Sequence, residues 1–182
     1  RHRFADTDVV LGCVAALRSE KNHAQLLEAI ARLRRDGLPI KGMIVGGGDL
    51  LETLEHRAAD LGIADHVVFT GSRQDVRPYV AAFDLGVLPS TAVETLSLSA
   101  LEIMGLGVPM VMSRIGGADE IVDDGCGRLF AKGDTDALCR AVKELLPDDV
   151  RAAAGRAARR VVEERFDARR MFDAYHAALT QP

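Results

Sequence analysis

The sequence predicts an α/β fold, a single Rossmann-like domain with about six mainly parallel strands and helices on both faces of the sheet. Short apolar runs alternate with segments in which apolar residues recur at helical spacing, which is typical of parallel strands joined by crossover helices. The runs are almost continuously apolar, as strands are when both faces of their sheet are covered. The length of 182 residues, with 48% hydrophobic and 27% charged residues, suits one globular domain with a substantial core.

The predicted strands are six apolar runs, which span residues 9–17, 40–45, 66–70, 85–88, 109–112 and 128–130. Ligands of such sheets bind in the crevice beyond the carboxyl ends of the strands. The loops that follow the strands are therefore the places to look for a site, and they begin at Arg18, Gly46, Gly71, Ser90 and Ser113.

The predicted helices fill the intervals between the strands. Asn22 and Gln25 have the spacing of a capping box at the start of the first helix, whose apolar face is Leu26, Leu27, Ile30 and Leu33. The second carries Leu51, Leu54, Ala58 and Leu61 and ends at Gly62. Short and longer helices follow at 76–83 and at 96–106, the latter stopped by Gly107. Asp134 caps another, with the stripe Leu138, Ala141, Val142 and Leu145.

The domain boundaries follow from this pattern. We expect an α/β core over about 8–147, and residues of about 148–180 should be helical throughout because they contain no strand candidate. The basic residues that cluster over 151–170 are interleaved with acidic ones, which indicates a solvated helix face.

Composition excludes several functional classes. A net charge of -4 and a pI near 5.7 give no general electrostatic reason to bind nucleic acid. The three cysteines are far apart, which favours buried thiols in a reduced, cytoplasmic setting. No signal peptide opens the chain, and no apolar run reaches the ~20 residues of a membrane span. The five histidines lack ligand spacing, so we assign no metal, and His23 and His56 are expected at the partly exposed surface of helices.

The glycine run at 46–48 does not fit the common phosphate-binding motifs. Gly46 and Gly48 give G-x-G, but Leu51 stands where the dinucleotide fingerprint needs its third glycine. No G-K-S or G-K-T is present, which excludes a P-loop. The run is interpreted as a tight turn between strand and helix, and close approach of a nucleotide to its backbone is the alternative.

Two glutamates mark the most informative segment. Glu94 and Glu102 have seven residues between them, and on one helix they would be ~12 Å apart and rotated by roughly 80°. They line one crevice only if Glu94 lies in the loop and Glu102 inside the helix. Glu102 stands among apolar residues, where a buried carboxylate would need partners. The alternative is an ordinary loop carboxylate and a helix surface residue.

This spacing is similar to the E-x7-E motif of retaining glycosyltransferases with the GT-B fold, the group 1 or family 4 enzymes. Other segments resemble that family in the same order: the loop with Lys21, the strand end at 45–48, the strand and exit at 67–71, and the glycine pair of 115–125. The resemblance runs from about residue 9 to 166. Two departures are Ala16, where the family usually has arginine, and Thr95-Leu96-Ser97 in place of Gly-Phe-Gly.

The resemblance implies roles for particular residues. Lys21 would supply charge to a diphosphate, with Arg18 as a substitute for the missing arginine, and Glu102 would accept hydrogen bonds from the ribose. Glu94 would be the catalytic residue beside the transferred sugar. A helix beginning near Leu96 would direct its amides at the phosphates, so the donor-binding set also includes Thr95, Leu96, Ser97 and Leu98. The loop Gly71-Ser72-Arg73 would border the base, with Gly46 and Gly48 nearby.

The implied function is that of the donor-binding domain, the C-terminal half of a GT-B enzyme. The enzyme would transfer a hexose-type sugar, with retention, from a UDP-, GDP- or ADP-sugar to a saccharide or lipid-linked acceptor, without cofactor or metal. Its acceptor domain would precede this chain and is absent from it, so the chain alone would fold but transfer no sugar. The full-length enzyme would be cytoplasmic, with peripheral association at the inner face of the membrane. The alternatives are a non-catalytic nucleotide-sugar-binding module and another enzyme of this fold, such as a sugar-nucleotide epimerase.

Overall fold

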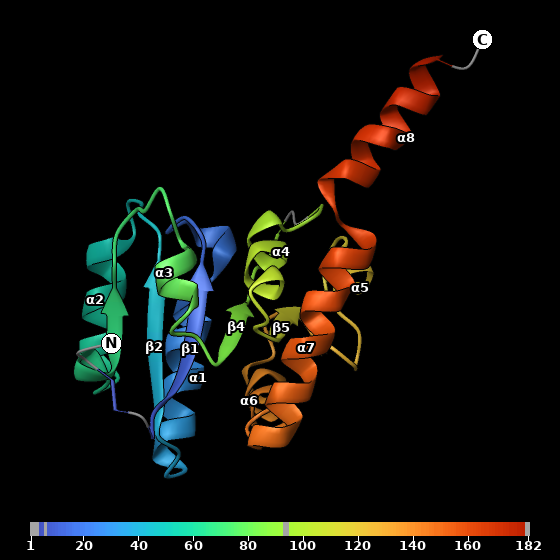
Figure 1. Cartoon of the computed structure of the whole chain (residues 1–182). Coiled ribbons are helices and arrows are strands. Elements are labelled where there is room, and N and C mark those ends of the chain that lie inside the picture. The colour runs from blue at the N-terminus through green and yellow to red at the C-terminus, as the bar shows by residue number, and fades with distance from the viewer. Residues whose placement is uncertain (1–3, 6, 93–94, 181–182) are drawn as a thin grey trace.

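The structure is a computed structural model that describes residues 4–5, 7–92 and 95–180. Its centre is a six-stranded parallel sheet in the order β3-β2-β1-β4-β5-β6 (Figure 1). The strands are β1 Val9–Val14, β2 Ile40–Val45, β3 Val67–Phe69, β4 Leu85–Leu88, β5 Met110–Ser113 and β6 Gly127–Phe130. All five pairings are parallel, so the predicted sheet is confirmed.

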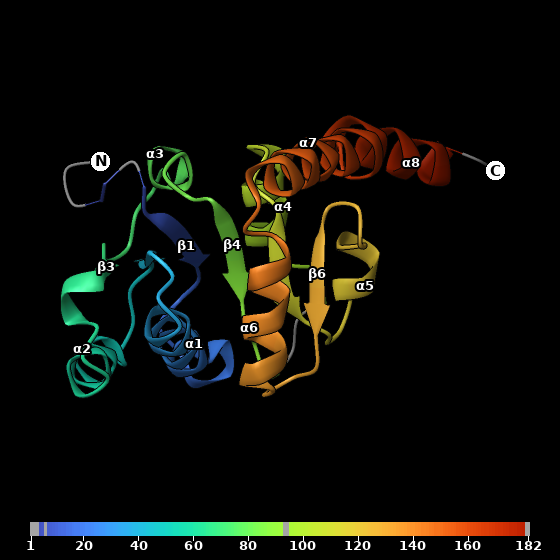
Figure 2. The same cartoon turned by 90° about the horizontal axis from the view of Figure 1, so that it is seen from below.

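Helices cover both faces of the sheet (Figure 2). One face carries α1 His23–Arg35, α2 Leu51–Asp60 and α6 Thr135–Glu144. The other carries α3 Arg77–Val80, α4 Leu98–Gly105 and α7 Asp148–Arg165. The shorter elements are the 3-10 turns η1 Ser19–Lys21 and η2 Ala64–His66 and the helix α5 Ala118–Ile121. Side chains from both layers and from the sheet form one hydrophobic core.

The strand order reverses between the neighbouring strands β1 and β4. From β1 the next strands are added toward one edge of the sheet, and from β4 they are added toward the other edge. In open α/β sheets this switch point opens a crevice at the carboxyl ends of the strands. The loops after β1 and β4 therefore flank the place where a ligand is expected.

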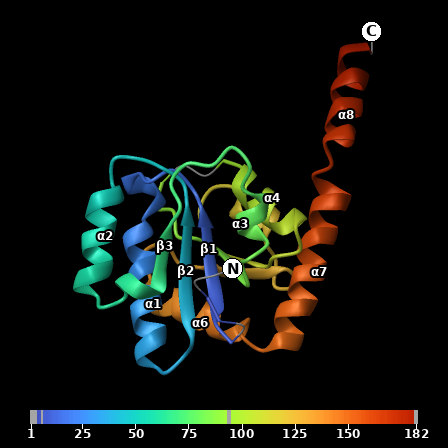
Figure 3. The same cartoon turned by 60° about the vertical axis from the view of Figure 1, so that its left-hand side comes forward.

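The C-terminal segment is helical as predicted, but it is broken into two helices. After α7 ends at Arg165, Asp167 accepts a hydrogen bond from the backbone amide of Arg169 and so caps a new helix, α8 Ala168–Thr180. This helix extends away from the rest of the molecule (Figures 1 and 3). Its Phe172, Tyr175 and Leu179 are exposed.

Two predicted helix starts are wrong in detail. Asn22 adopts a left-handed conformation and makes no capping bond to the backbone; its side-chain amide donates to Gln25 Oε1 at 2.8 Å instead. The helix expected from residue 96 begins at Leu98, because Ser97 is extended and caps it by accepting from the Ala100 amide. The cap at Asp134 is confirmed, since its side chain accepts from the Ala137 amide at 2.8 Å.

The three cysteines are buried thiols that form no disulfide, as predicted. Among the described residues, no helix is both long and apolar enough to cross a membrane.

Candidate functional site

A hollow of about 380 Å³ lies where β1 and β2 end. We call it the donor-side pocket. Its walls come from the loops after β1, β2 and β3 and from the first turn of α4: Val14, Ala15, Ala16, Lys21, Val45, Gly46, Gly47, Ser72, Arg73, Val76 and Ser99. Segments far apart in the sequence thus meet at the carboxyl edge of the sheet, as the topology requires.

The glycines after β2 are required by close backbone packing. A Cβ on Gly46 would lie 1.9 Å from the carbonyl oxygen of Ala15, and one on Gly48 would lie 2.6 Å from that of Leu17. The Leu17 amide also donates to Gly47 at 2.9 Å. The tight-turn interpretation therefore has a specific cause, which is that the loop after β1 lies directly against the glycine run.

The loop after β3 is tied to the same place. The Gly46 amide donates to the Gly71 carbonyl at 3.1 Å, and Gly71 has a φ of 72°, which favours glycine. The two residues that follow, Ser72 and Arg73, then line the donor-side pocket. Of the predicted glycines, Gly46 borders the pocket, whereas Gly48 and Gly71 do not line it.

The two predicted cations are placed differently. Lys21 ends the 3-10 turn after β1 and lines the donor-side pocket. Arg18 precedes that turn, is exposed and is not among the residues that line the pocket. The structure therefore brings one of the two to the pocket, and the position of Ala16 in its wall is filled by a methyl group.

The start of α4 presents hydroxyls on one side and leucines on the other. Ser97 is buried and its Oγ lies 3.2 Å from Ser99 Oγ, which faces the donor-side pocket. Leu96 and Leu98 line a separate apolar hollow of about 520 Å³ against the α7–α8 junction. Leu98 is 70% exposed.

Glu102 is exposed, so the expectation of a buried carboxylate is wrong. Its neighbours Ala100, Ile103 and Met104 face the core, and the 100° step of the helix turns Glu102 away from them. It lines a hollow of about 470 Å³ between α4 and the loop before α3, and Val76 borders both this hollow and the donor-side pocket. Glu94, the predicted catalytic residue, lies outside the described residues.

His23 is buried rather than exposed, contrary to prediction, with 1% of its surface accessible. In the part of the chain that the structure describes, neither ring nitrogen has a hydrogen-bond partner. Burial, reinforced by the positive charge of Lys21, lowers the pKa of this imidazole from 6.5 to about 4. His56 is exposed, as expected.

Sequence reasoning missed Ser99 as a pocket residue and named Arg73 only as part of the loop after β3 that would border the base. The Arg73 guanidinium lies over the Tyr79 ring, 5.4 Å from its centroid, and the residue lines the donor-side pocket. Its place two residues after Gly71 was the available signal. Ser99 carried no such signal, because its place in the pocket depends on where α4 begins.

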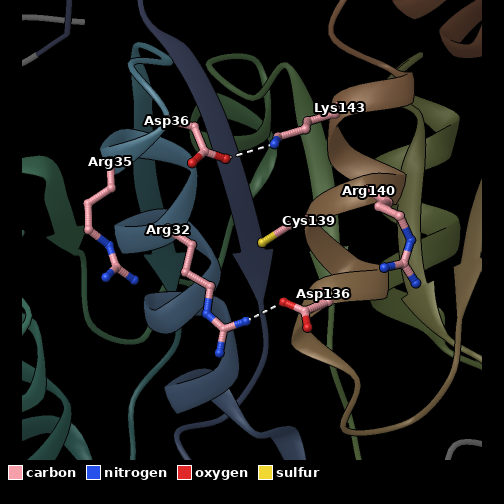
Figure 4. Close-up of a pocket in the computed structure, with 7 residues that line it drawn as sticks. All are labelled: Arg32, Arg35, Asp36, Asp136, Cys139, Arg140 and Lys143. Carbon is pink, nitrogen blue, oxygen red and sulfur yellow. Dashed lines mark hydrogen bonds and ion pairs between the residues drawn. The ribbon is translucent and has the colours of Figure 1, made fainter.

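A groove between α1 and α6 has a different character (Figure 4). Two ion pairs cross it, one on either side of Cys139: Arg32 with Asp136 at 2.5 Å and Lys143 with Asp36 at 2.7 Å. The exposed Asp36 carboxyl has a pKa below its usual range because Lys143 donates to it. The charges join two helices to each other, so we assign the groove no ligand.

The family comparison agrees with this geometry. The sequence profile described as Glycosyl transferases group 1 matches residues 8–148. The chain belongs to this family. The match takes in all six strands and the helices up to α6, which means that the donor-side pocket is built entirely from the matched part.

Individual members of the glycosyl transferases group 1 family resemble the chain over most of its length. GDP-mannose-dependent alpha-(1-6)-phosphatidylinositol monomannoside mannosyltransferase of Mycolicibacterium smegmatis is 39% identical over 163 residues, which cover 85% of this chain and 42% of the relative. Lipopolysaccharide core biosynthesis glycosyltransferase LpsE of Rhizobium meliloti is 32% identical over 146 residues, 80% of this chain and 41% of the relative. The chain therefore spans less than half the length of these relatives.

The fold is shared with solved glycosyltransferase structures. Anabaena HepE in complex with UDP and glucose has a TM-score of 0.88 and 26% identity, covering 97% of this chain and 49% of HepE. The described sheet and helices are thus one Rossmann-like domain of the GT-B type. Among the described residues, no three His, Cys, Asp or Glu side chains are grouped so as to hold a metal ion.

Proposed function

We propose that this chain is the donor-binding domain of a retaining glycosyltransferase that transfers a hexose from a nucleoside diphosphate sugar to a saccharide or lipid-linked acceptor. The observation that carries the proposal is the donor-side pocket, where Lys21, Arg73 and Ser99 converge at the switch point of the sheet. A cleft at this place whose few polar side chains are hydrogen-bond donors suits a ligand that carries phosphate groups.

The chemistry of the pocket fits a diphosphate leaving group. As the bond to the sugar breaks, negative charge grows on the diphosphate and has to be stabilised. Lys21 supplies a point charge, and the Ser99 hydroxyl and the first amides of α4 supply hydrogen-bond donors. No cofactor or metal enters this scheme, because the cation and the helix dipole act on the charge directly.

We propose a guanine nucleotide as the first donor to test. The mycobacterial relative is named for its dependence on GDP-mannose, whereas the HepE complex contains UDP. Arg73 supports guanine, because a guanidinium donates to the two acceptors on one edge of that base, while adenine presents an amino group there. Glu102, exposed beside the neighbouring hollow, would accept from the ribose hydroxyls. Glu94 would face the transferred hexose.

The acceptor would be held by a second domain in the N-terminal half of the full-length enzyme. The exposed Phe172, Tyr175 and Leu179, which recur along α8 at helical spacing, and the exposed Leu96 and Leu98 support this, since groups of exposed apolar side chains mark contact surfaces. Without that domain nothing closes the cleft or excludes water, so the chain alone should transfer no sugar. We propose that the full-length enzyme acts in the cytoplasm, peripherally at the inner face of the membrane, where a lipid-linked acceptor would be presented.

Calorimetric titration with GDP, UDP, ADP and the corresponding nucleosides tests the proposal. We expect GDP to bind most tightly and each diphosphate to bind more tightly than its nucleoside. Lys21→Ala should weaken GDP binding by about tenfold and leave guanosine unchanged, because the lysine acts on phosphate charge. Arg18→Ala is the matched control outside the pocket and should bind like the parent.

The opposite results are equally clear. A parent protein that binds none of the three diphosphates would contradict a donor site. Tight binding of GDP that Lys21→Ala does not weaken would show that the diphosphate binds away from Lys21. A full-length enzyme that binds GDP-mannose yet transfers no sugar to any lipid-linked acceptor would favour the non-catalytic binding module.

A further inference from the structure

The loop between β4 and α4 begins at a contact between two buried serines. Ser113 is the last residue of β5 and is 2% exposed. Its hydroxyl donates to the carbonyl oxygen of Ser90 at 2.5 Å and lies 3.5 Å from that of Leu88. The loop after β4 is therefore held by a side chain of the adjacent strand.

The position of this contact in the sheet explains its role. Backbone pairing between β4 and β5 ends at Leu88 and Met112, whereas β5 continues to pair with β6 as far as Ser113. β4 thus leaves the sheet one residue before β5 does. The Ser113 hydroxyl replaces the next backbone contact and fixes the direction in which the departing chain runs.

The residue after Ser90 is tied to the lysine turn. The Thr91 amide donates to the Glu20 carbonyl at 2.8 Å, and the Thr91 hydroxyl lies 3.4 Å from the same oxygen. Glu20 directly precedes Lys21 within the turn η1. A shift of the chain at Ser90 would consequently be transmitted to the backbone that carries Lys21.

The far end of the loop rests on the segment that follows β5. A Cβ on Gly117 would lie 2.2 Å from the carbonyl oxygen of Thr95, so the two backbones are in direct contact. Ser113 and Gly117 come from one short segment of the chain. That segment supports the loop at its beginning and at the point where α4 is about to start.

We propose that Ser113 is a positioning residue for diphosphate binding, one that sets the distance between Lys21 and the first turn of α4. The inference rests on the proposed function of the donor-side pocket. It assigns to β5 a role in the site although Ser113 does not line the pocket. Positioning of this kind should affect binding of the diphosphate alone. Ser72, Arg73 and Val76, which would contact the nucleoside, belong to the segment after β3 and not to the loop that Ser113 holds.

The test is the ratio of guanosine to GDP dissociation constants, measured by calorimetry on the parent and on Ser113→Ala. We expect the ratio to fall by about tenfold, the upper limit for the net contribution of one buried hydrogen bond. Guanosine binding should stay unchanged. The matched control is Val111→Ala, on the same strand and fully buried, which loses core packing but no contact to the loop, and it should keep the parent ratio.

The outcomes separate this inference from the proposed function. If the parent does not bind GDP more tightly than guanosine, the proposed function fails. If it does and Ser113→Ala keeps the parent ratio, or Val111→Ala loses as much, the positioning role is overturned. Should Ser113→Ala not fold, Ser113→Cys replaces the hydroxyl with a weaker donor at the same position, and a parent-like ratio in that protein overturns the proposal.

Discussion

The two sides of the sheet's switch point are built differently. On the side of β1, β2 and β3, the loops are in close backbone contact, with carbonyl groups lying against glycines. On the side of β4, the loop is held at its ends, and Leu96 at the end of this loop and Leu98 at the start of α4 are exposed. The first side has the properties of a preformed pocket wall, while the second has an apolar surface that the domain itself leaves uncovered.

Under the proposed function, this difference separates the residues that would bind the nucleotide from the surface that a second domain would cover. Residues that bind a diphosphate need fixed positions, because a misplaced charge or amide stabilises it poorly. An apolar surface beside them stabilises nothing in the isolated domain and has a use only when another surface covers it. The predictions below test the first property and then the second.

Gly46→Ala should have the largest effect. The new Cβ would lie 1.9 Å from the Ala15 carbonyl oxygen, so the loop after β1 would have to move. We expect a loss of about 4 kcal/mol in the free energy of unfolding, from overpacking and backbone strain together. Gly62→Ala is the control, since Gly62 has a φ of 69° but no atom within 4 Å of the added carbon, and it should cost about 1 kcal/mol.

Urea denaturation of both variants measures the difference. Similar losses for Gly46→Ala and Gly62→Ala would mean that the close contact between the loops is not rigid. The preformed character of this side would then have no support.

Acid should destabilise the same side through His23. Its pKa is about 4 in the folded protein and 6.5 as an unperturbed group, so between these values the unfolded chain binds more protons. Stability therefore falls as the pH drops from 6.5 to 4, by about 3 kcal/mol at the lower limit. His23→Gln should remove this loss, while His56→Gln, at an exposed position, should retain it.

Free energies of unfolding at several pH values between 7 and 4 provide the measurement. Burial and the charges of Arg34 and Lys41 also lower the pKa of His66, which adds a slope of the same sign in every variant. The difference between His23→Gln and His56→Gln isolates His23. Equal slopes for the two would show that the imidazole at position 23 is hydrated.

Glu102→Gln should have a smaller effect, on the border between the two sides. The carboxylate is exposed, so a hydrogen bond to ribose competes with water and contributes about 1 kcal/mol, roughly fivefold in affinity. GDP and guanosine should weaken equally because both contain the ribose. Glu52→Gln, an exposed exchange on α2, is the control, and a loss restricted to GDP would show that Glu102 acts on the phosphates instead.

Much of the fold was predictable from the sequence because its strands are apolar runs with clear stops. The strand 40–45 was predicted to the residue, since Pro39 and Gly46 bound it. Lys21 lines the donor-side pocket because the loop after the first strand of such a sheet lies at the carboxyl edge, where the crevice is expected.

The failures have different causes. His23 lies three, four and seven residues before Leu26, Leu27 and Ile30, so the helical period already places it on the apolar face of α1, and the prediction of partial exposure overlooked this. Glu102 has apolar neighbours in sequence, yet Leu98 and Leu101 among them are themselves exposed or only half-buried. The contact of Ser113 with Ser90 joins the end of β5 to the loop after β4, which no local sequence pattern relates.

The smallest effect is expected at Leu98, and it bears on the apolar side. Leu98→Asn removes a side chain that is 70% exposed in this domain, so the free energy of unfolding should change by less than about 0.5 kcal/mol. Ile103→Ala, in the same helix but fully buried, should cost about 2–5 kcal/mol. Urea denaturation compares the two. A large loss at Leu98 would mean that the leucine packs within the domain in solution, which would remove the argument for a covering surface. A negligible loss would leave an apolar side chain beside the donor-side pocket with no role in the domain's own stability, as expected of a residue that a second domain covers.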